Sequence, residues 1–146
     1  MIRLARADDA AQVAAIYAPF VTGSATSFEY SPPDAAETTA RIAAALAFAP
    51  YLVSEVGDGI LGFAYASKHR DRAAYQWSVD VSVYIHERAR RQGVGRALYT
   101  SLFALLRLQG FYTAHAGISL PNAAVIRHSS ALSGRPFANT TYRDPI

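Results

Sequence analysis

One short stretch of the sequence combines the residue types that bind an anion. Positions 90–96 read Arg-Arg-Gln-Gly-Val-Gly-Arg, after a run that alternates like a β-strand and before residues with helical spacing. N–H groups at the start of a helix have no intrahelical partner, and glycine lets a phosphate come close to the main chain. Arginine adds fixed positive charge. We therefore predict a pyrophosphate-binding turn formed by Arg90, Arg91, Gln92, Gly93, Val94, Gly95 and Arg96.

Two familiar phosphate-binding motifs do not fit this turn. The dinucleotide-binding fingerprint needs a third glycine three residues after the second, where this chain has Leu98. The P-loop needs a lysine followed by serine or threonine after its glycines, whereas Gly95 is followed by Arg96. An ordinary exposed strand-to-helix turn with surface arginines is the alternative interpretation.

The composition limits the class of protein. The chain has 146 residues, of which 51% are hydrophobic and 17% charged, as in a globular domain with one core. It has no cysteine, so we expect no disulfide and a reducing, cytoplasmic location. No apolar run predicts a signal peptide or a membrane partner. The formal net charge of +3 admits anionic ligands, but a single lysine argues against a nucleic-acid partner.

Hydrophobic periodicity predicts where the strands and helices lie. The predicted strands are residues 2–6, 51–56, 60–67, 74–85 and 111–118, with a hairpin turn at residues 57–59. Asp8 is the predicted N-cap of a first helix that carries Val13, Ile16, Tyr17 and Phe20. The other predicted helices are residues 34–48, with Ile42, Leu46 and Ala49 on one face, residues 92–108, with Leu98, Leu102, Leu105 and Leu106 buried, and one near Pro121. This order favours a mixed α/β sheet rather than a doubly wound one.

The order β-α-α-β-β-β-α-β-α, with the glycine turn before the helix at residues 92–108, resembles the GNAT acyl-CoA N-acyltransferases. Shorter matches resemble their phosphinothricin and methionine sulfone (sulfoximine) acetyltransferase subfamily. They are Tyr51-Leu52-Val53-Ser54-Glu55-Val56, Gly62-Phe63-Ala64-Tyr65-Ala66, Tyr75-x-Trp77, Val83-Tyr84-Ile85, Gly93-Val94-Gly95, Leu98-Tyr99, Gln109-Gly110-Phe111 and Leu120-Pro121-Asn122. The resemblance implies one GNAT domain over residues 1–146, an α/β (α+β) fold whose mixed, mostly antiparallel sheet has splayed strands flanked by helices.

The resemblance also implies an activity. Members of the subfamily transfer an acetyl group from acetyl-CoA to the amino group of a small amino-acid-like acceptor, such as phosphinothricin, methionine sulfone or methionine sulfoximine. A homodimer is the assembly that the resemblance implies. The histidines at positions 69, 86 and 115 lack metal-ligand spacing, so we predict no metal.

Such a reaction needs proton removal from an ammonium and stabilisation of an oxyanion beside the thioester. Asp80, mid-strand between valines, is the predicted base. Related enzymes carry a glutamate there, so the shorter aspartate implies action through a water or a hold on the substrate ammonium. Where the strand pair splays, we expect the backbone groups of Val83, Tyr84 and Ile85 to pair with pantetheine amides and to polarise the thioester carbonyl. A plain core strand with a carboxylate paired to an arginine is the alternative interpretation.

The resemblance places the remaining predicted site residues around these two features. Arg70, Arg72 and Tyr75 fall where the subfamily binds the anionic groups of the acceptor. Phe28 and Trp77 are predicted to wall the acceptor side chain, and Asn122 to lie near the coenzyme. A solvated loop for the arginines and core positions for the aromatic residues are the alternatives.

After Asn122 the resemblance fades. The family pattern expects a serine after the Pro-Asn pair, then a His-Glu pair and a Leu-Gly-aromatic turn, whereas residues 125–136 read V-I-R-H-S-S-A-L-S-G-R-P. We therefore expect an atypical or truncated C-terminal part, with His128 and Tyr142 as candidate general acids. A CoA-binding GNAT-fold protein with weak or no catalysis is a second hypothesis. A basic nucleic-acid binder, which needs interleaved aromatic and basic residues, is a third.

Overall fold

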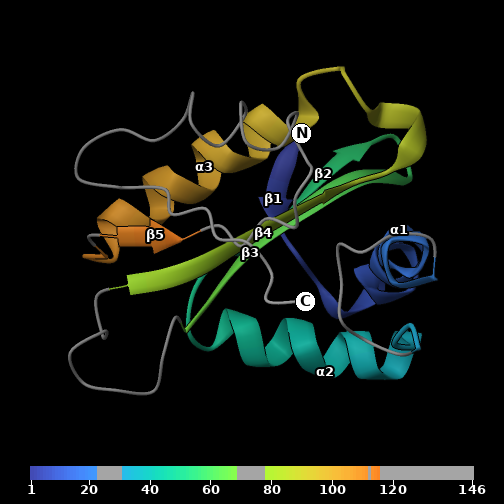
Figure 1. Ribbon diagram of the computed structural model, residues 1–146, viewed down its shortest axis with the longest axis horizontal. Coiled ribbons are helices and arrows are strands. Elements are labelled where there is room, and N and C mark those ends of the chain that lie inside the picture. Colours follow the sequence, from blue (N-terminus) through green and yellow to red (C-terminus); the bar gives the residue numbers. More distant parts are fainter. Residues whose placement is uncertain (23–30, 69–77, 112, 116–146) are drawn as a thin grey trace, which may run out of the picture.

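The computed structural model describes residues 1–22, 31–68, 78–111 and 113–115, and these form a five-stranded sheet beside three helices (Figure 1). The strands are β1 (Ile2–Leu4), β2 (Tyr51–Val56), β3 (Gly59–Lys68), β4 (Ser78–Ile85) and β5 (Thr113–His115), which lie in the spatial order β1-β2-β3-β4-β5. All neighbours are antiparallel except β4 and β5, which are parallel. The mixed, mostly antiparallel sheet predicted from the sequence is therefore confirmed.

Helices cover both faces of the sheet. They are α1 (Ala10–Thr22), α2 (Ala35–Leu46) and α3 (Val94–Leu108). Figure 1 shows α1 and α2 against one face and α3 against the other. Because α3 connects β4 to β5, it provides the crossover that a parallel strand pair needs. The predicted order of elements is confirmed as far as the structure describes the chain.

Two hydrophobic cores hold these layers together. On the α3 face, Leu98, Leu102 and Leu106 are fully buried and pack against Val79 and Val81 of β4. On the opposite face, the core consists mainly of Val13, Ile16, Ile42, Val53 and Phe63. Burying each such side chain contributes roughly 1.5–3 kcal/mol. The 3.6-residue spacing of the leucines thus predicted the correct face of α3, with Leu105 partly buried at its margin.

The N-terminal elements differ from the prediction. Strand β1 ends at Leu4, and a 3-10 turn, η1 (Ala7–Asp9), precedes α1. Asp8 is exposed, whereas the buried Asp9 accepts the Arg6 N–H at 2.7 Å and two hydrogen bonds from the Arg3 guanidinium at 2.8 Å. The prediction of Asp8 as N-cap was wrong, because Arg6 is the N-cap of this turn and Asp9, not Asp8, makes the hydrogen bonds to the Arg6 N–H and the Arg3 guanidinium.

The ends of α2 and α3 also differ from the prediction. Asp34 caps α2, since its Oδ1 accepts the Glu37 N–H at 2.8 Å. The helix ends at Leu46, which is 37% exposed rather than buried, while Ala49 in the following turn is 2% exposed. Helix α3 begins two positions later than predicted because Gly93 adopts a left-handed conformation. The predicted helix near Pro121 lies outside the described residues.

Candidate functional site

The predicted anion-binding turn connects β4 to α3 through a short 3-10 helix, η3 (Glu87–Ala89). Arg91 has a φ of 64°, and Gly93, the N-cap of α3, has a φ of 80° and a ψ of 5°. Both φ values are left-handed, a conformation that glycine adopts freely and that costs other residues about 1–2 kcal/mol. The chain reverses here, so α3 returns along the sheet before β5 pairs with β4 (Figure 1).

The first turn of α3 contains backbone N–H groups that precede the first hydrogen bond within the helix. The Ala97 N–H donates to the Gly93 carbonyl oxygen at 3.0 Å, so the N–H groups of Val94, Gly95 and Arg96 come before this bond. Gly93 has no side chain that could cap them, and the first turn contains no acidic residue. The positive end of the helix dipole lies at the same place. This arrangement of the backbone suits phosphate oxygens.

Three arginines belong to the residues that lead into and open α3. Arg90, Arg91 and Arg96 are all exposed. The Arg90 guanidinium carbon lies 5.7 Å from the centroid of the Phe20 ring in α1, so a cation–π contact links the turn to the opposite helical layer. Exposed guanidinium groups beside open backbone donors form a positively charged corner that favours a pyrophosphate.

Local hydrogen bonds brace the same turn. His86 Nδ1 accepts the Arg88 N–H at 3.1 Å, and Gln92 Nε2 donates to the Arg88 carbonyl oxygen at 2.9 Å. Ala89 is buried beneath them at 1% exposure. Gln92, predicted to contact the coenzyme, therefore uses one amide hydrogen in a bond within this exposed turn, which holds the turn in place.

The register of β4 determines which backbone groups reach its edge. His86 N–H donates to the Leu61 carbonyl oxygen at 2.7 Å. Because bonded pairs alternate in an antiparallel ladder, Tyr84 directs its N–H and C=O toward β3, while Val83 and Ile85 direct theirs toward the other side. The prediction that Tyr84 also offers its backbone groups at this edge does not agree with the register.

On that side of β4, the described pairing with β5 covers only Ser78–Asp80. Within the described residues, the backbone groups of Val83 and Ile85 lie beyond this pairing. At about 3.3 Å per residue, the edge from Ile85 to Val81 spans roughly 13 Å. An extended ligand carrying amide groups could pair along such an edge as an added strand.

Asp80 lies next to this edge. Its neighbours Val79 and Val81 face α3, whereas the Tyr84 ring packs against Tyr17 of α1 at a centroid distance of 5.0 Å. Side chains alternate along a strand, so half-buried Asp80 faces α1 and α2 together with Tyr84. The structure thus brings the predicted base and the predicted coenzyme turn onto one strand–turn–helix unit.

The structure does not describe the predicted acceptor-binding residues. Phe28, Arg70, Arg72, Tyr75, Trp77 and Asn122, together with the candidate general acids His128 and Tyr142, all lie outside the described residues.

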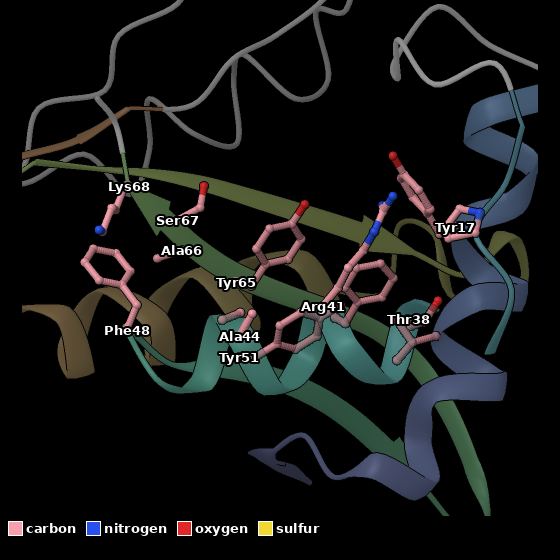
Figure 2. Close-up of a pocket in the computed structure, with 14 residues that line it drawn as sticks. Tyr17, Thr38, Arg41, Ala44, Phe48, Tyr51, Tyr65, Ala66, Ser67 and Lys68 are labelled. Carbon is pink, nitrogen blue, oxygen red and sulfur yellow. The ribbon is translucent and has the colours of Figure 1, made fainter. Parts of the chain in front are cut away.

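A chamber whose lining includes Ser67, the β3 partner of Asp80, was not predicted from the sequence. It opens between α2 and the sheet and includes Tyr51, Phe63 and Tyr65 (Figure 2). The available signal was the aromatic pair Phe63 and Tyr65, spaced by two on one strand and therefore on one face. The sequence interpretation used those residues only as part of a family match.

Two features are absent from the part of the chain that the structure describes. No three histidine, aspartate or glutamate side chains come together there as a set of metal ligands. Nor does any helix among those residues combine the length and the apolar character needed to cross a bilayer.

Comparison with known proteins identifies the class to which this fold and turn belong. A model of the acetyltransferase (GNAT) domain matches residues 2–132. The chain therefore belongs to the GNAT acetyltransferase family. The match continues past Asn122, where the sequence resemblance was expected to fade.

Two of the relatives are phosphinothricin N-acetyltransferases. The chain is 46% identical over 104 residues to phosphinothricin N-acetyltransferase of Alcaligenes faecalis, an alignment covering 70% of this chain and 53% of the relative. It is 36% identical over 131 residues to phosphinothricin N-acetyltransferase of Streptomyces viridochromogenes, covering 90% and 72%. The chain thus spans about half the length of the Alcaligenes protein.

A solved structure has the same fold. It is a GNAT superfamily phosphinothricin acetyltransferase from Sinorhizobium meliloti in complex with AcCoA. It matches with a TM-score of 0.86 and 31% sequence identity, covering 90% of this chain and 72% of that one. The predicted fold and subfamily resemblance are confirmed.

Proposed function

We propose that this protein is an acetyl-CoA-dependent N-acetyltransferase that acetylates the amino group of a small amino-acid-like acceptor of the phosphinothricin, methionine sulfone or methionine sulfoximine type. The observation that carries the proposal is the start of α3. There Gly93, in a left-handed conformation, leaves the backbone N–H groups without a capping side chain, and three exposed arginines are close in sequence. A single connection joins this helix start to β4, the strand that carries Asp80. The names of the relatives support the choice of acceptor class.

The residues present fit acetyl-CoA in charge and in backbone geometry. The N–H groups of Val94, Gly95 and Arg96 would donate to the pyrophosphate, and Arg90 and Arg91 would neutralise its charge. Along β4, the backbone groups of Val83 and Ile85 would pair with the pantetheine amides. Asn122 remains a predicted contact of the coenzyme.

Asp80 would take a proton from the acceptor ammonium, directly or through one water. The freed amine would form a bond to the thioester carbonyl carbon, the carbon–sulfur bond would break, and the proton lost from the new amide nitrogen would pass to the sulfur, so that the coenzyme leaves as a thiol. A backbone N–H near Val83 would stabilise the negative charge on the carbonyl oxygen. Arg70, Arg72, Tyr75, Phe28 and Trp77 remain the predicted acceptor contacts. The homodimer and the cytoplasmic location also remain predictions.

Thiol release tests the proposal. The protein is incubated with acetyl-CoA and, in turn, methionine sulfone, methionine sulfoximine and phosphinothricin, and the free thiol is followed over time. We expect acceptor-dependent release with at least one of the three. Thermal stabilisation by CoA without release on any amine would instead favour the hypothesis of a CoA-binding protein with weak or no catalysis.

A substitution tests the assigned base. We expect Asp80→Asn to lower turnover by about 10²-fold or more, the range of general acid–base contributions, with little change in CoA affinity. The matched control is Asp58→Asn at the exposed hairpin turn, which should change neither quantity. Equal losses of turnover and CoA affinity in Asp80→Asn would remove Asp80 from the role of base.

A further inference from the structure

The chamber between α2 and the sheet is large enough for a ligand. Its volume is about 390 Å³, within the range of about 300–1,000 Å³ that is typical of small-molecule sites. Figure 2 shows side chains of α2 on one side and of β2 and β3 on the other. The lining residues are Val13, Tyr17, Pro33, Thr38, Arg41, Ala44, Ala45, Phe48, Tyr51, Phe63, Tyr65, Ala66, Ser67 and Lys68.

Aromatic rings form the sheet side of this chamber. The Tyr51 ring lies nearly parallel to those of Tyr65 and Phe63, with interplanar angles of 8° and 10° and centroid distances of 5.0 and 5.8 Å. Burial raises the pKa of the Tyr51 hydroxyl, so it stays protonated at neutral pH. A layer of stacked rings offers dispersion and ring-to-ring contact to a planar apolar group.

All charged residues in the described lining of the chamber are positively charged. Arg41 and Lys68 are cationic, and none of the described residues that line the chamber is acidic. Arg41 also pairs with Glu37 outside the chamber at 2.8 Å, and the Lys68 ammonium lies 5.9 Å from the Phe48 ring centroid. Such a lining favours an occupant that combines an apolar body with a negative charge.

The lining of the same chamber includes a buried hydroxyl group that can still form a hydrogen bond. Thr38 is 4% exposed, and its Oγ1 has no hydrogen-bond partner among the described residues. Buried polar groups of this kind are normally satisfied by a protein group, a water or a ligand.

The chamber begins one strand away from the predicted base. Ser67 on β3 pairs with Asp80 on β4, and Tyr65 pairs with Ser82. Directly opposite residues on one face have Cβ atoms about 4.5–5.5 Å apart. An acceptor whose amine reaches Asp80 would therefore have Tyr65 and Ser67 beside it, and its side chain could extend across β3 into the chamber.

We propose that this chamber receives the acceptor side chain and that the preferred acceptor is an α-amino acid with a large aromatic side chain. The proposal rests on the acetyl transfer proposed above and extends its acceptors to aromatic amino acids, placing these ahead of the phosphinothricin and methionine sulfone type. The ring layer would bind the aromatic group, and the positive lining favours an acceptor that retains its carboxylate.

Two matched acceptors test the preference. L-phenylalanine and methionine sulfone are compared by thiol release, and L-phenylalanine binding is measured separately by thermal shift and calorimetry. We expect a kcat/KM for L-phenylalanine at least equal to that for methionine sulfone. Turnover of methionine sulfone without turnover or binding of L-phenylalanine would overturn the chamber assignment and leave the proposed function standing. Binding of L-phenylalanine without turnover of it, of methionine sulfone, of methionine sulfoximine or of phosphinothricin would overturn the proposed function and leave the chamber as a binding site.

Two neighbouring alanines on α2 provide the matched variants. Both alanines are exposed, but Ala44 lines the chamber and Ala43 does not. Ala44→Phe should fill the space and lower the ratio of kcat/KM for L-phenylalanine over methionine sulfone at least tenfold, and it should weaken L-phenylalanine binding. Ala43→Phe should leave both unchanged, with circular dichroism confirming that each variant folds. Equal effects of the two variants, or none from Ala44→Phe, would overturn the proposal.

Discussion

Gly62 on β3 lies directly opposite Ile85 on β4, and the two backbones approach so closely that no side chain fits between them. A Cβ atom added to Gly62 would lie 2.8 Å from Ile85 Cδ1 and 2.8 Å from the Tyr84 carbonyl oxygen. The absence of a side chain at Gly62 therefore sets the spacing of β3 and β4 where β4 carries Val83 and Ile85. Because these residues form the proposed pantetheine edge, the glycine is linked to coenzyme binding through the position of one strand.

Gly62→Ala should push β4 away from β3 at this point. The contact includes a backbone oxygen, which cannot rotate away, so we expect a loss of about 1–3 kcal/mol in unfolding free energy, as for other overpacked cores. CoA affinity should fall together with stability. Urea denaturation and calorimetric titration with CoA measure the two effects. An alanine variant with wild-type stability would show that the strands adjust without cost.

Gly93 and Gly110, at the two ends of α3, allow backbone strain to be separated from coenzyme binding. Their φ values are 80° and 89°, and an added Cβ would meet nothing within 4 Å at either position. Gly93→Ala and Gly110→Ala should therefore each cost about 1 kcal/mol of stability through the left-handed backbone alone. Only Gly93→Ala should also weaken CoA binding, because it disturbs the donors at the helix start. Equal CoA affinity in the two variants would argue against a pyrophosphate site there.

A substitution at Arg91 should change the thermal stability of the protein and its affinity for CoA in opposite directions. It is exposed and holds a φ of 64°, which is costly for a residue with a Cβ. Arg91→Gly removes both the backbone strain and the positive charge. Loss of the strain should leave Tm unchanged or raise it. Loss of the charge should lower CoA affinity about fivefold, equivalent to about 1 kcal/mol for an exposed ion pair. Arg91→Lys keeps the charge and the strain, and should therefore retain affinity without gaining stability. A glycine variant that binds CoA as tightly as wild type would show that Arg91 is only a surface residue.

Local patterns predicted most of the elements around the site. The strand Tyr51–Val56 agrees with its predicted range, because its flanking Pro50 and Gly57 are strong local signals. Asp34 was placed at the start of α2, where it acts as N-cap, and the glycine turn was placed between β4 and α3. These features are determined by residues that are close in the sequence. Hydrophobic periodicity and turn-forming residues report such local information, so these features could be predicted.

The features that the sequence did not reveal are mostly non-local in origin. Arg3 joins Asp9 to Glu55, and no pattern within residues 2–9 shows that Glu55, 52 positions from Arg3, belongs to this cluster. The strain at Arg91 follows from the path between two packed elements, since arginine has no intrinsic tendency toward positive φ. The chamber forms only when α2 packs over Tyr51 and Tyr65, so the sequence does not predict that its lining residues lie close together.

The Arg3 cluster should make stability depend on pH in the acid range. Its guanidinium holds the pKa of Asp9 below the ordinary value of 3.8 and that of Glu55 below 4.5, chiefly by hydrogen bonding. A lowered pKa in the folded state means that this stabilisation is complete above those ordinary values and is lost as pH falls below them, through the folded-state pKa values. Arg3→Gln should therefore unfold more easily than wild type at pH 7, and the difference should shrink toward pH 2. Urea denaturation between pH 2 and pH 7 measures it, and two parallel stability curves would show that Arg3 does not control these carboxylates.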